Sequence, residues 1–149
     1  MARFRFSLKS VEKYRNILLD EAKGKYAKAT QDINKQKEKI LKIEEQIADI
    51  NSELNQKNFQ GTSILEIQST KQYIKVLENK LEEENDKLKG LQKIEARRRA
   101  ELVEAKTDAM SIEKIKEKRI EEFKAEEAKK EELAIQEFVS NQISGRNKE

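Results

Sequence analysis

The stretch NQKNFQGTSILE, residues 55–66, interrupts a chain that otherwise has the pattern of continuous helix. Gly61 lies in its middle, and glycine is the residue that most readily adopts the backbone conformations needed to leave a helix. Ser63 and Glu66 have the spacing of a capping box, in which both side chains hydrogen-bond to free amides at the start of a new helix. We therefore predict that the chain reverses here, instead of continuing as one kinked helix.

The reversal divides a single predicted domain, residues 1–149, into two long helices. Ser7 is expected to cap the first helix, because serine is favoured at the position before a helix begins. The patterns predict a first helix over about 7–56, a turn over about 57–62, a second helix over about 63–140 and a flexible C-terminus over 141–149.

The composition favours long helices over a compact domain. Charged residues make up 41% of the chain and hydrophobic residues 36%, which leaves too little apolar surface for a globular core. Proline is absent, and helix-forming residues such as Lys, Glu, Leu and Ala are abundant. The formal net charge of +3 is a small surplus over a long surface, so nucleic-acid binding is not indicated.

The missing residue types argue against several classes of function. The chain has no histidine and no cysteine, which excludes Ser/His/Asp and Cys/His catalysis and the usual zinc sites. It also lacks a glycine-rich phosphate loop, and its carboxylates are expected on solvated helix faces. We therefore expect no enzyme activity, cofactor, metal or small-molecule substrate. With no signal peptide and no long apolar run, a cytoplasmic location is expected.

Apolar residues recur at alternating spacings of three and four on both sides of residues 55–66, which is typical of a coiled-coil seam. Each seam contains one strongly polar member, Gln36 in the first helix and Glu84 in the second. Each also contains an eleven-residue step, over 18–29 and over 91–102, which we expect to relax the supercoil. The first seam comprises Leu8, Val11, Tyr14, Leu18, Ala22, Tyr26, Ala29, Ile33, Gln36, Ile40, Ile43, Ile47, Ile50 and Leu54. The second comprises Ile67, Thr70, Ile74, Leu77, Leu81, Glu84, Leu88, Leu91, Leu102, Ala105, Ala109 and Ile112.

The two seams resemble reversed copies of each other. Residues that pair in an antiparallel hairpin have numbers with a constant sum, and here the sum is about 120 or 121. This register places Gln36 opposite Glu84 and aligns the two eleven-residue steps. The predicted fold class is all-α, a long antiparallel two-helix coiled-coil hairpin with unequal arms. The alternative is a straight parallel dimer. Predicted pairs include Leu54 with Ile67, Ile43 with Leu77, Ile33 with Leu88, Val11 with Ala109 and Leu8 with Ile112.

The second helix is the longer one, so its C-terminal part has no predicted partner in the first helix. It still carries apolar residues, which indicates either an external partner or a solvated helix with Phe4 and Phe6 packed on its base. The residues concerned are Ile115, Ile120, Phe123, Leu133, Ile135, Phe138 and Val139.

Two smaller features each have two interpretations. The basic cluster is either a surface for an acidic partner or an ordinary solvated face. It comprises Lys89, Lys93, Arg97, Arg98 and Arg99. Gly24 and Gly90 lie in or beside the eleven-residue steps and are either compliant joints or tolerated surface glycines.

Three segments resemble the flagellar type III export family FliJ. They are FRFSLKSVEKYR (4–15), QYIKVLENKL (72–81) and KKEELAIQEF (129–138), and the resemblance covers nearly the full length. It implies a coiled coil similar to the central stalk of rotary ATPases. Such proteins insert into the export ATPase ring, promote its assembly and activity, contact the export gate and handle export chaperones.

The resemblance also implies partners and contact residues. The expected partners are a FliI-like export ATPase hexamer, the cytoplasmic domain of a FlhA-like export gate and export chaperones, with the chain monomeric when alone. The expected location is the cytoplasm, peripherally at the inner face of the cell membrane. The alternatives are a homodimeric coiled-coil scaffold and the equivalent stalk of a virulence-type secretion system. Candidate ring contacts are Phe4, Phe6, Ile120, Phe123, Leu133 and Phe138, and candidate gate contacts are Ile43, Ile50, Tyr73 and Leu77.

Overall fold

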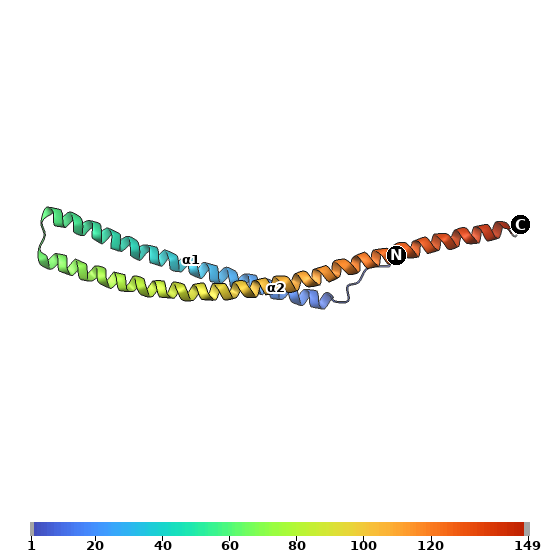
Figure 1. Ribbon diagram of the computed structural model, residues 1–149, viewed down its shortest axis with the longest axis horizontal. Helices are drawn as coiled ribbons and strands as arrows, with labels where there is room; N and C mark the ends of the chain where they lie inside the picture. Colours follow the sequence, from blue (N-terminus) through green and yellow to red (C-terminus); the bar gives the residue numbers. More distant parts are fainter. Residues whose placement is uncertain (1, 148–149) are drawn as a thin grey trace. The chain divides into compact units, whose positions relative to one another are not determined.

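The computed structural model describes residues 2–147 and consists of two α-helices joined by a short turn (Figure 1). Helix α1 spans Lys9–Gln60 and helix α2 spans Ile64–Asn147. Within the described residues there is no strand, so the all-α fold class is confirmed. The helices pack against each other in opposite directions, and α2 is 84 residues long against 52 for α1, which confirms a hairpin with unequal arms.

Both helices continue past the ends indicated by the seam pattern. Helix α1 extends to Gln60, the turn contains only residues 61–63, and α2 extends to Asn147. No proline stops either helix, and the Asn, Gln and Lys residues before the turn tolerate a helical backbone although they no longer contribute to the seam. Residues 148–149 of the expected flexible C-terminus lie outside the described part.

The chain forms two compact units. The turn unit comprises Glu21–Val103, with the C-terminal part of α1, the turn and the N-terminal part of α2. The terminal unit comprises Met1–Asp20 and Glu104–Glu149, with the start of α1 and the remainder of α2. Each unit contains segments from both helices, so each is held by its own contacts between helices.

The turn is built by the residues that its sequence indicates. Gly61 ends α1 with a φ of 89°, in the left-handed region that favours glycine. The Ser63 hydroxyl caps α2 by accepting a hydrogen bond from the Glu66 amide at 3.2 Å, and the Ser63 carbonyl accepts one from the Ile67 amide at 3.2 Å. The Glu66 carboxylate accepts a hydrogen bond from the Thr62 hydroxyl. The predicted cap is therefore present, with Thr62 as the partner of Glu66.

The core of the turn unit is a thin seam between the helices. Its buried residues repeat at spacings of three and four, because only that face of each helix meets the other. None of the described side chains reaches complete burial, as expected when two helices have no third layer to cover them. The buried apolar residues are Ala22, Ala29, Ile33, Ile40, Ile43 and Leu54 in α1 and Ile74 and Leu77 in α2.

The predicted eleven-residue step over 91–102 is not an interruption of the seam, whereas the members predicted within the step over 18–29 are all buried or half-buried. In α2 the half-buried positions between Leu91 and Leu102 are Glu95, Arg98 and Glu101, and the first two preserve the spacing of three and four. A search for apolar residues misses them because they are charged. Their aliphatic stems cover the seam while their charges stay near solvent, and Arg98 pairs with Glu101 at 3.0 Å.

The same correction applies at the start of α1. Val11 and Tyr14 were assigned to the seam by the apolar pattern, but they are 38% and 57% exposed. The half-buried residues are instead Glu12 and Arg15. Arg15 forms an ion pair with Asp108 at 3.2 Å, so charged side chains continue the seam where apolar ones were expected.

The register of the terminal unit also differs from the constant sum. That rule places Glu12 opposite Asp108, whereas the Glu12 carboxylate lies 3.2 Å from the Lys116 ammonium and Asp108 pairs with Arg15. Side chains lean toward the N-terminus of their own helix, so contacting residues of antiparallel helices have numbers that add to more than those of level backbones. Long charged side chains make this offset largest.

Ser7 does not cap α1, and this prediction is wrong. The Leu8 carbonyl accepts a hydrogen bond from the Glu12 amide at 2.9 Å, which places Leu8 at the position before the helix. The Ser7 hydroxyl accepts a hydrogen bond from Arg119 of α2 instead. Ser7 therefore attaches the N-terminal segment to α2, and among the described residues no side chain caps α1.

Candidate interaction surfaces

The C-terminal part of α2 exposes apolar residues along its length. Every residue from 128 to 146 is exposed, although the segment is helical. Leu133 and Phe138, two of the predicted ring contacts, are 53% and 63% exposed. Ile135, Val139 and Ile143 follow one another at four-residue spacing and, with Gln136 and Ser140, line a shallow groove of about 340 Å³. This segment has the character of a helix that lacks its partner.

The other four predicted ring contacts lie in the terminal unit and take part in packing there. The Phe4 and Phe123 rings meet edge to face, with centroids 5.6 Å apart. The Arg119 guanidinium lies 5.7 Å from the centre of the Phe6 ring. Phe4, Phe6, Ile120 and Phe123 are all half-buried. Phe4 therefore lies on Phe123 and Phe6 lies beside Arg119, the neighbour of Ile120 in the chain, while Leu133 and Phe138 lie farther along α2.

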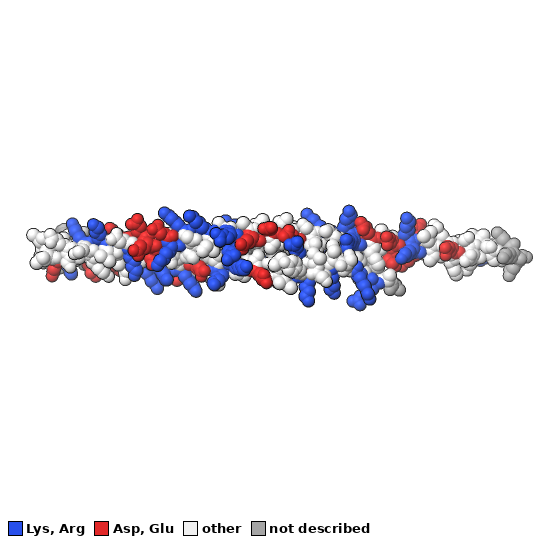
Figure 2. All heavy atoms as spheres, turned by 90° about the horizontal axis from the view of Figure 1, so that it is seen from below, with Lys and Arg blue, Asp and Glu red and all other residues white. Residues whose placement is uncertain are grey.

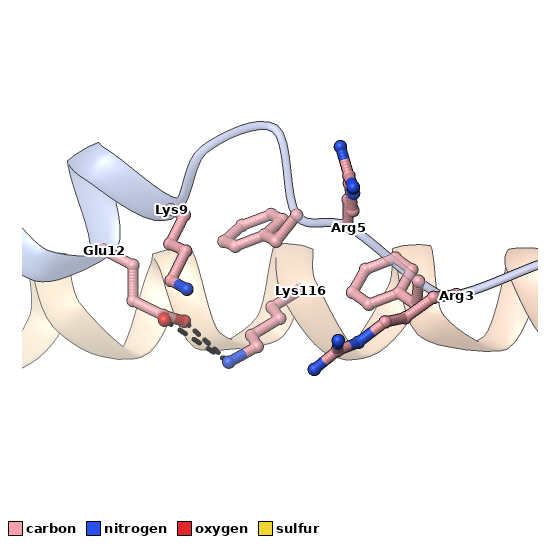
Figure 3. Close-up of a pocket in the computed structure, with 7 residues that line it drawn as sticks. Arg3, Arg5, Lys9, Glu12 and Lys116 are labelled. Carbon is pink, nitrogen blue, oxygen red and sulfur yellow. Dashed lines mark hydrogen bonds and ion pairs between the residues drawn. The ribbon is translucent and has the colours of Figure 1, made fainter.

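The segment of residues 2–8, here called the N-terminal strap, has no helical structure and runs along α2 (Figure 3). Half-buried Phe4 and Phe6 alternate with exposed Arg3 and Arg5, as expected for an extended segment with one face against a helix. The apolar pattern found the two phenylalanines but not the arginines or Lys116, which line the same cleft. The alternation Arg-Phe-Arg-Phe was the available signal.

The four predicted gate contacts are divided between core and surface in the turn unit. Ile43 and Leu77 are each only 6% exposed and belong to the seam, and Ile50 is half-buried. Tyr73 is 51% exposed. Among these four, Tyr73 is the residue best placed to touch another protein directly.

The predicted meeting of Gln36 and Glu84 is confirmed. The Gln36 amide donates hydrogen bonds to the Glu84 carbonyl at 2.9 Å and to its carboxylate, and Gln36 is only 6% exposed. The hydrogen bond from Gln36 and that from Lys87 lower the pKa of Glu84, because both favour the charged carboxylate. This buried polar layer is satisfied within the turn unit and resembles a register lock more than a ligand site.

The residues of the basic cluster differ in their contacts. Arg99 hydrogen-bonds to Tyr26 and pairs with Glu95, which together raise the pKa of the arginine. Lys89, Lys93 and Arg97 are exposed. Figure 2 shows basic and acidic side chains interspersed over much of the visible face, so the cluster does not form an isolated basic surface there.

The turn presents a second apolar surface that the seam analysis missed. Phe59 is 97% exposed, Ile64 74% and Leu65 78%. Residues 58–65 contain no charged residue, which is unusual in a chain that is 41% charged. This absence of charged residues is the feature of the sequence that could have indicated the apolar surface.

Other kinds of site have little support. No group of acidic residues in the described part of the chain is arranged to hold a metal ion. Within the same residues, neither helix has an apolar stretch that would let it cross a membrane.

Among three comparisons with known proteins, the one with family models gives a match. No curated protein and no solved structure gives a significant match. The family model described as "Flagellar FliJ protein" matches residues 4–148. The match includes residues 4–8 of the strap, both helices and the turn. This coverage of nearly the whole chain agrees with the three resembling segments and with the two-helix hairpin. The chain therefore belongs to the FliJ family of flagellar type III export components.

Proposed function

We propose that this protein is a stalk-like binding module of the flagellar export apparatus. It engages the ring of the export ATPase through its terminal unit, promotes ring assembly and activity, and links the ring to the export gate and to export chaperones. It acts peripherally at the inner face of the cell membrane and carries out no chemistry itself. An asymmetric helix that touches only some subunits of a ring favours their bound conformation and thereby couples the subunits.

The observation that carries this proposal is the exposed end of α2. A helix of mixed charge that packs against nothing over residues 128–146 still presents large apolar side chains. Burying such side chains in a partner is worth about 1.5–3 kcal/mol each before the costs of association. The groove residues Ile135, Val139 and Ile143 are the strongest candidates for direct ring contact.

The test compares two triple variants of the full chain. Ile135→Ser, Val139→Ser and Ile143→Ser remove the apolar side of the segment. The matched control replaces Lys130, Glu137 and Asn141 by serine, on the opposite side of the same helical segment. Both are mixed with the purified export ATPase, and ATP hydrolysis and ring assembly are measured.

We expect the apolar variant to lose stimulation of ATP hydrolysis and the control to keep it. Circular dichroism of each variant checks that helix content is retained. Equal stimulation by both variants and the parent would refute this contact, and no effect of the parent on the ATPase would refute the proposed function. Deleting residues 131–149 provides a second test of the ring contact, and this deletion leaves the contact of Phe123 with Phe4 intact.

For the export gate, Tyr73 supplies the testable contact because Ile43 and Leu77 are buried. Tyr73→Ala is expected to weaken binding to the purified cytoplasmic domain of the gate by about 1–2 kcal/mol, a common range for an interface tyrosine. Val76→Ala, at a 57% exposed neighbouring position, is the control. Equal affinities of both variants would remove Tyr73 from the gate contact.

The isolated protein is expected to be a monomer, because the hairpin already buries both seams within one chain. Light scattering should give a mass near 17.4 kDa. Twice that mass would favour the homodimeric scaffold instead.

A further inference from the structure

The N-terminal strap and the start of α1 enclose a cleft in the terminal unit. Its volume is about 540 Å³ (Figure 3). The alternation of the strap turns its aromatic side chains toward α2 and leaves its arginines more exposed. The cleft is lined by Arg3, Phe4, Arg5, Phe6, Lys9, Glu12 and Lys116.

Positive charge predominates in this lining. Glu12 is the only acidic residue of the lining, and its carboxylate is paired with Lys116 at 3.2 Å. Among the described residues, Arg3, Arg5 and Lys9 form no ion pair. In Figure 3, Arg3, Lys9 and Lys116 point to one side of the strap, and Arg5 points to the other. The cleft therefore presents cations in two directions, three of them uncompensated.

The N-terminus of α1 adds to this positive potential. Lys9 is the first helical residue, where the helix dipole is positive and an acidic residue would be favourable. The side chain of Ser7, which was expected to cap the helix, is hydrogen-bonded to Arg119 instead. The acidic residue of the first turn, Glu12, is already paired with Lys116, so Lys9 lies at the positive end of α1 without an ion-pair partner among the described residues.

We propose that the cleft binds a carboxylate-rich segment of a partner protein. Several carboxylates along one chain can pair with Arg3, Arg5 and Lys9, although these side chains point to two sides of the strap. Arginine pairs with a carboxylate through two parallel hydrogen bonds. The contact of Phe4 with Phe123 holds the strap against α2 and thereby fixes the backbone that carries Arg3 and Arg5.

The geometry favours a peptide over an anionic membrane. A basic segment that binds a membrane surface generally inserts its aromatic residues, but Phe4 packs on Phe123 and Phe6 lies beside Arg119. Arg3, Lys9 and Lys116 point to the same side of the strap, where the surface is concave, and an extended acidic chain follows such a cleft better than a flat lipid surface does.

The first experiment measures binding of a fluorescein-labelled hexaglutamate peptide to the full-length chain by fluorescence anisotropy. The site variant is Arg3→Ser with Lys9→Ser. The control, Lys35→Ser with Lys42→Ser, removes the same charge from the exposed surface of the turn unit, away from the basic cluster. We expect the site variant to lose affinity by about tenfold or more and the control by less than about twofold.

Equal losses in the two variants would overturn the proposal, because they would show attraction to net charge alone. The second arm uses vesicles of phosphatidylcholine with about 30% phosphatidylglycerol. A site variant that loses vesicle binding but keeps peptide binding would identify a membrane site and also overturn the proposal. Amide chemical shifts of Lys9 and Ser10 that do not move on peptide addition would count against the cleft as well.

Circular dichroism establishes that the helices persist in each variant, and Phe4→Ala, which loosens the strap while keeping every charge, provides a second test. It should weaken peptide binding if the strap must be seated on α2. Peptide affinity equal to that of the parent would refute the role of the seated strap. The export ATPase is absent from these measurements, so their outcome is independent of the proposed function.

Discussion

Replacing glycine by alanine should have opposite effects on stability at different positions of this chain. Gly24 and Gly90 lie inside regular helix, and a Cβ built at either position meets no atom within 4 Å. Gly61 likewise has open space around it, but its φ of 89° is one that alanine rarely adopts. The sign of the effect therefore depends on the backbone alone, since steric contact is absent at all three positions.

The magnitudes follow from helix propensity and backbone strain. Alanine is more favourable than glycine by about 0.8–1.0 kcal/mol in a helix interior, so Gly24→Ala and Gly90→Ala should each raise the free energy of unfolding by about that amount. At Gly61 the left-handed conformation costs an L-residue about 1–2 kcal/mol. Reduced freedom of the unfolded chain returns about 0.4–1 kcal/mol. Gly61→Ala should therefore lower the free energy of unfolding by about 1 kcal/mol.

Urea unfolding followed by circular dichroism measures these differences. The midpoint should move up for the two helical variants and down for Gly61→Ala, with the slope against urea unchanged. Destabilisation by Gly24→Ala or Gly90→Ala would refute the description of these positions as open, regular helix. Both helices are continuous at these residues, so we expect the stabilised variants to stimulate the export ATPase as the parent does. Reduced stimulation together with higher stability would support the alternative, a compliant joint.

Three further outcomes are expected. Gln36→Ala should lower the free energy of unfolding by about 1–3 kcal/mol, because it removes two hydrogen bonds from a buried site, and urea unfolding checks this. The lowered pKa of Glu84 means that its charged form stabilises the fold above the ordinary pKa of 4.5, and that this contribution is lost as pH falls through the folded value. The stability advantage of the parent over Glu84→Gln should therefore shrink on acidification below about pH 4.5, and an advantage independent of pH would contradict it. A double-mutant cycle with Phe4→Ala and Phe123→Ala should give a coupling of about 0.5–1.5 kcal/mol, whereas additive effects would show that the ring contact contributes no coupling.

The hairpin was predictable because its signals are local or periodic. Gly61 and Ser63 act on the backbone immediately around them, and the apolar spacing of three and four requires only that one helix face be buried. The pairing of Gln36 with Glu84 followed from the same periodicity, since a polar residue in one seam needs a partner in the other. These features do not require knowledge of distant contacts.

Charged seam residues and the strap were not predictable in this way. Glu12 and Arg15 look like surface residues until the positions of Lys116 and Asp108 in α2 are known. Similarly, Ser7 has the character of a helix cap, and only the nearby Arg119 explains why its hydroxyl is used elsewhere. Periodicity cannot indicate whether a charge is covered, because that depends on which opposite charge the second helix brings within reach.

The amino-acid sequence alone determined that this protein is a helical hairpin with one arm longer than the other, reversed within NQKNFQGTSILE. That outcome rests on backbone preferences and on the period of the apolar residues, both of which are encoded locally. The tertiary structure decided how the ends are used. It seats the strap on α2 through contacts such as that of Phe4 with Phe123, which join residues more than a hundred positions apart. This seating places Arg3, Arg5 and Lys9 in the lining of one cleft with Lys116.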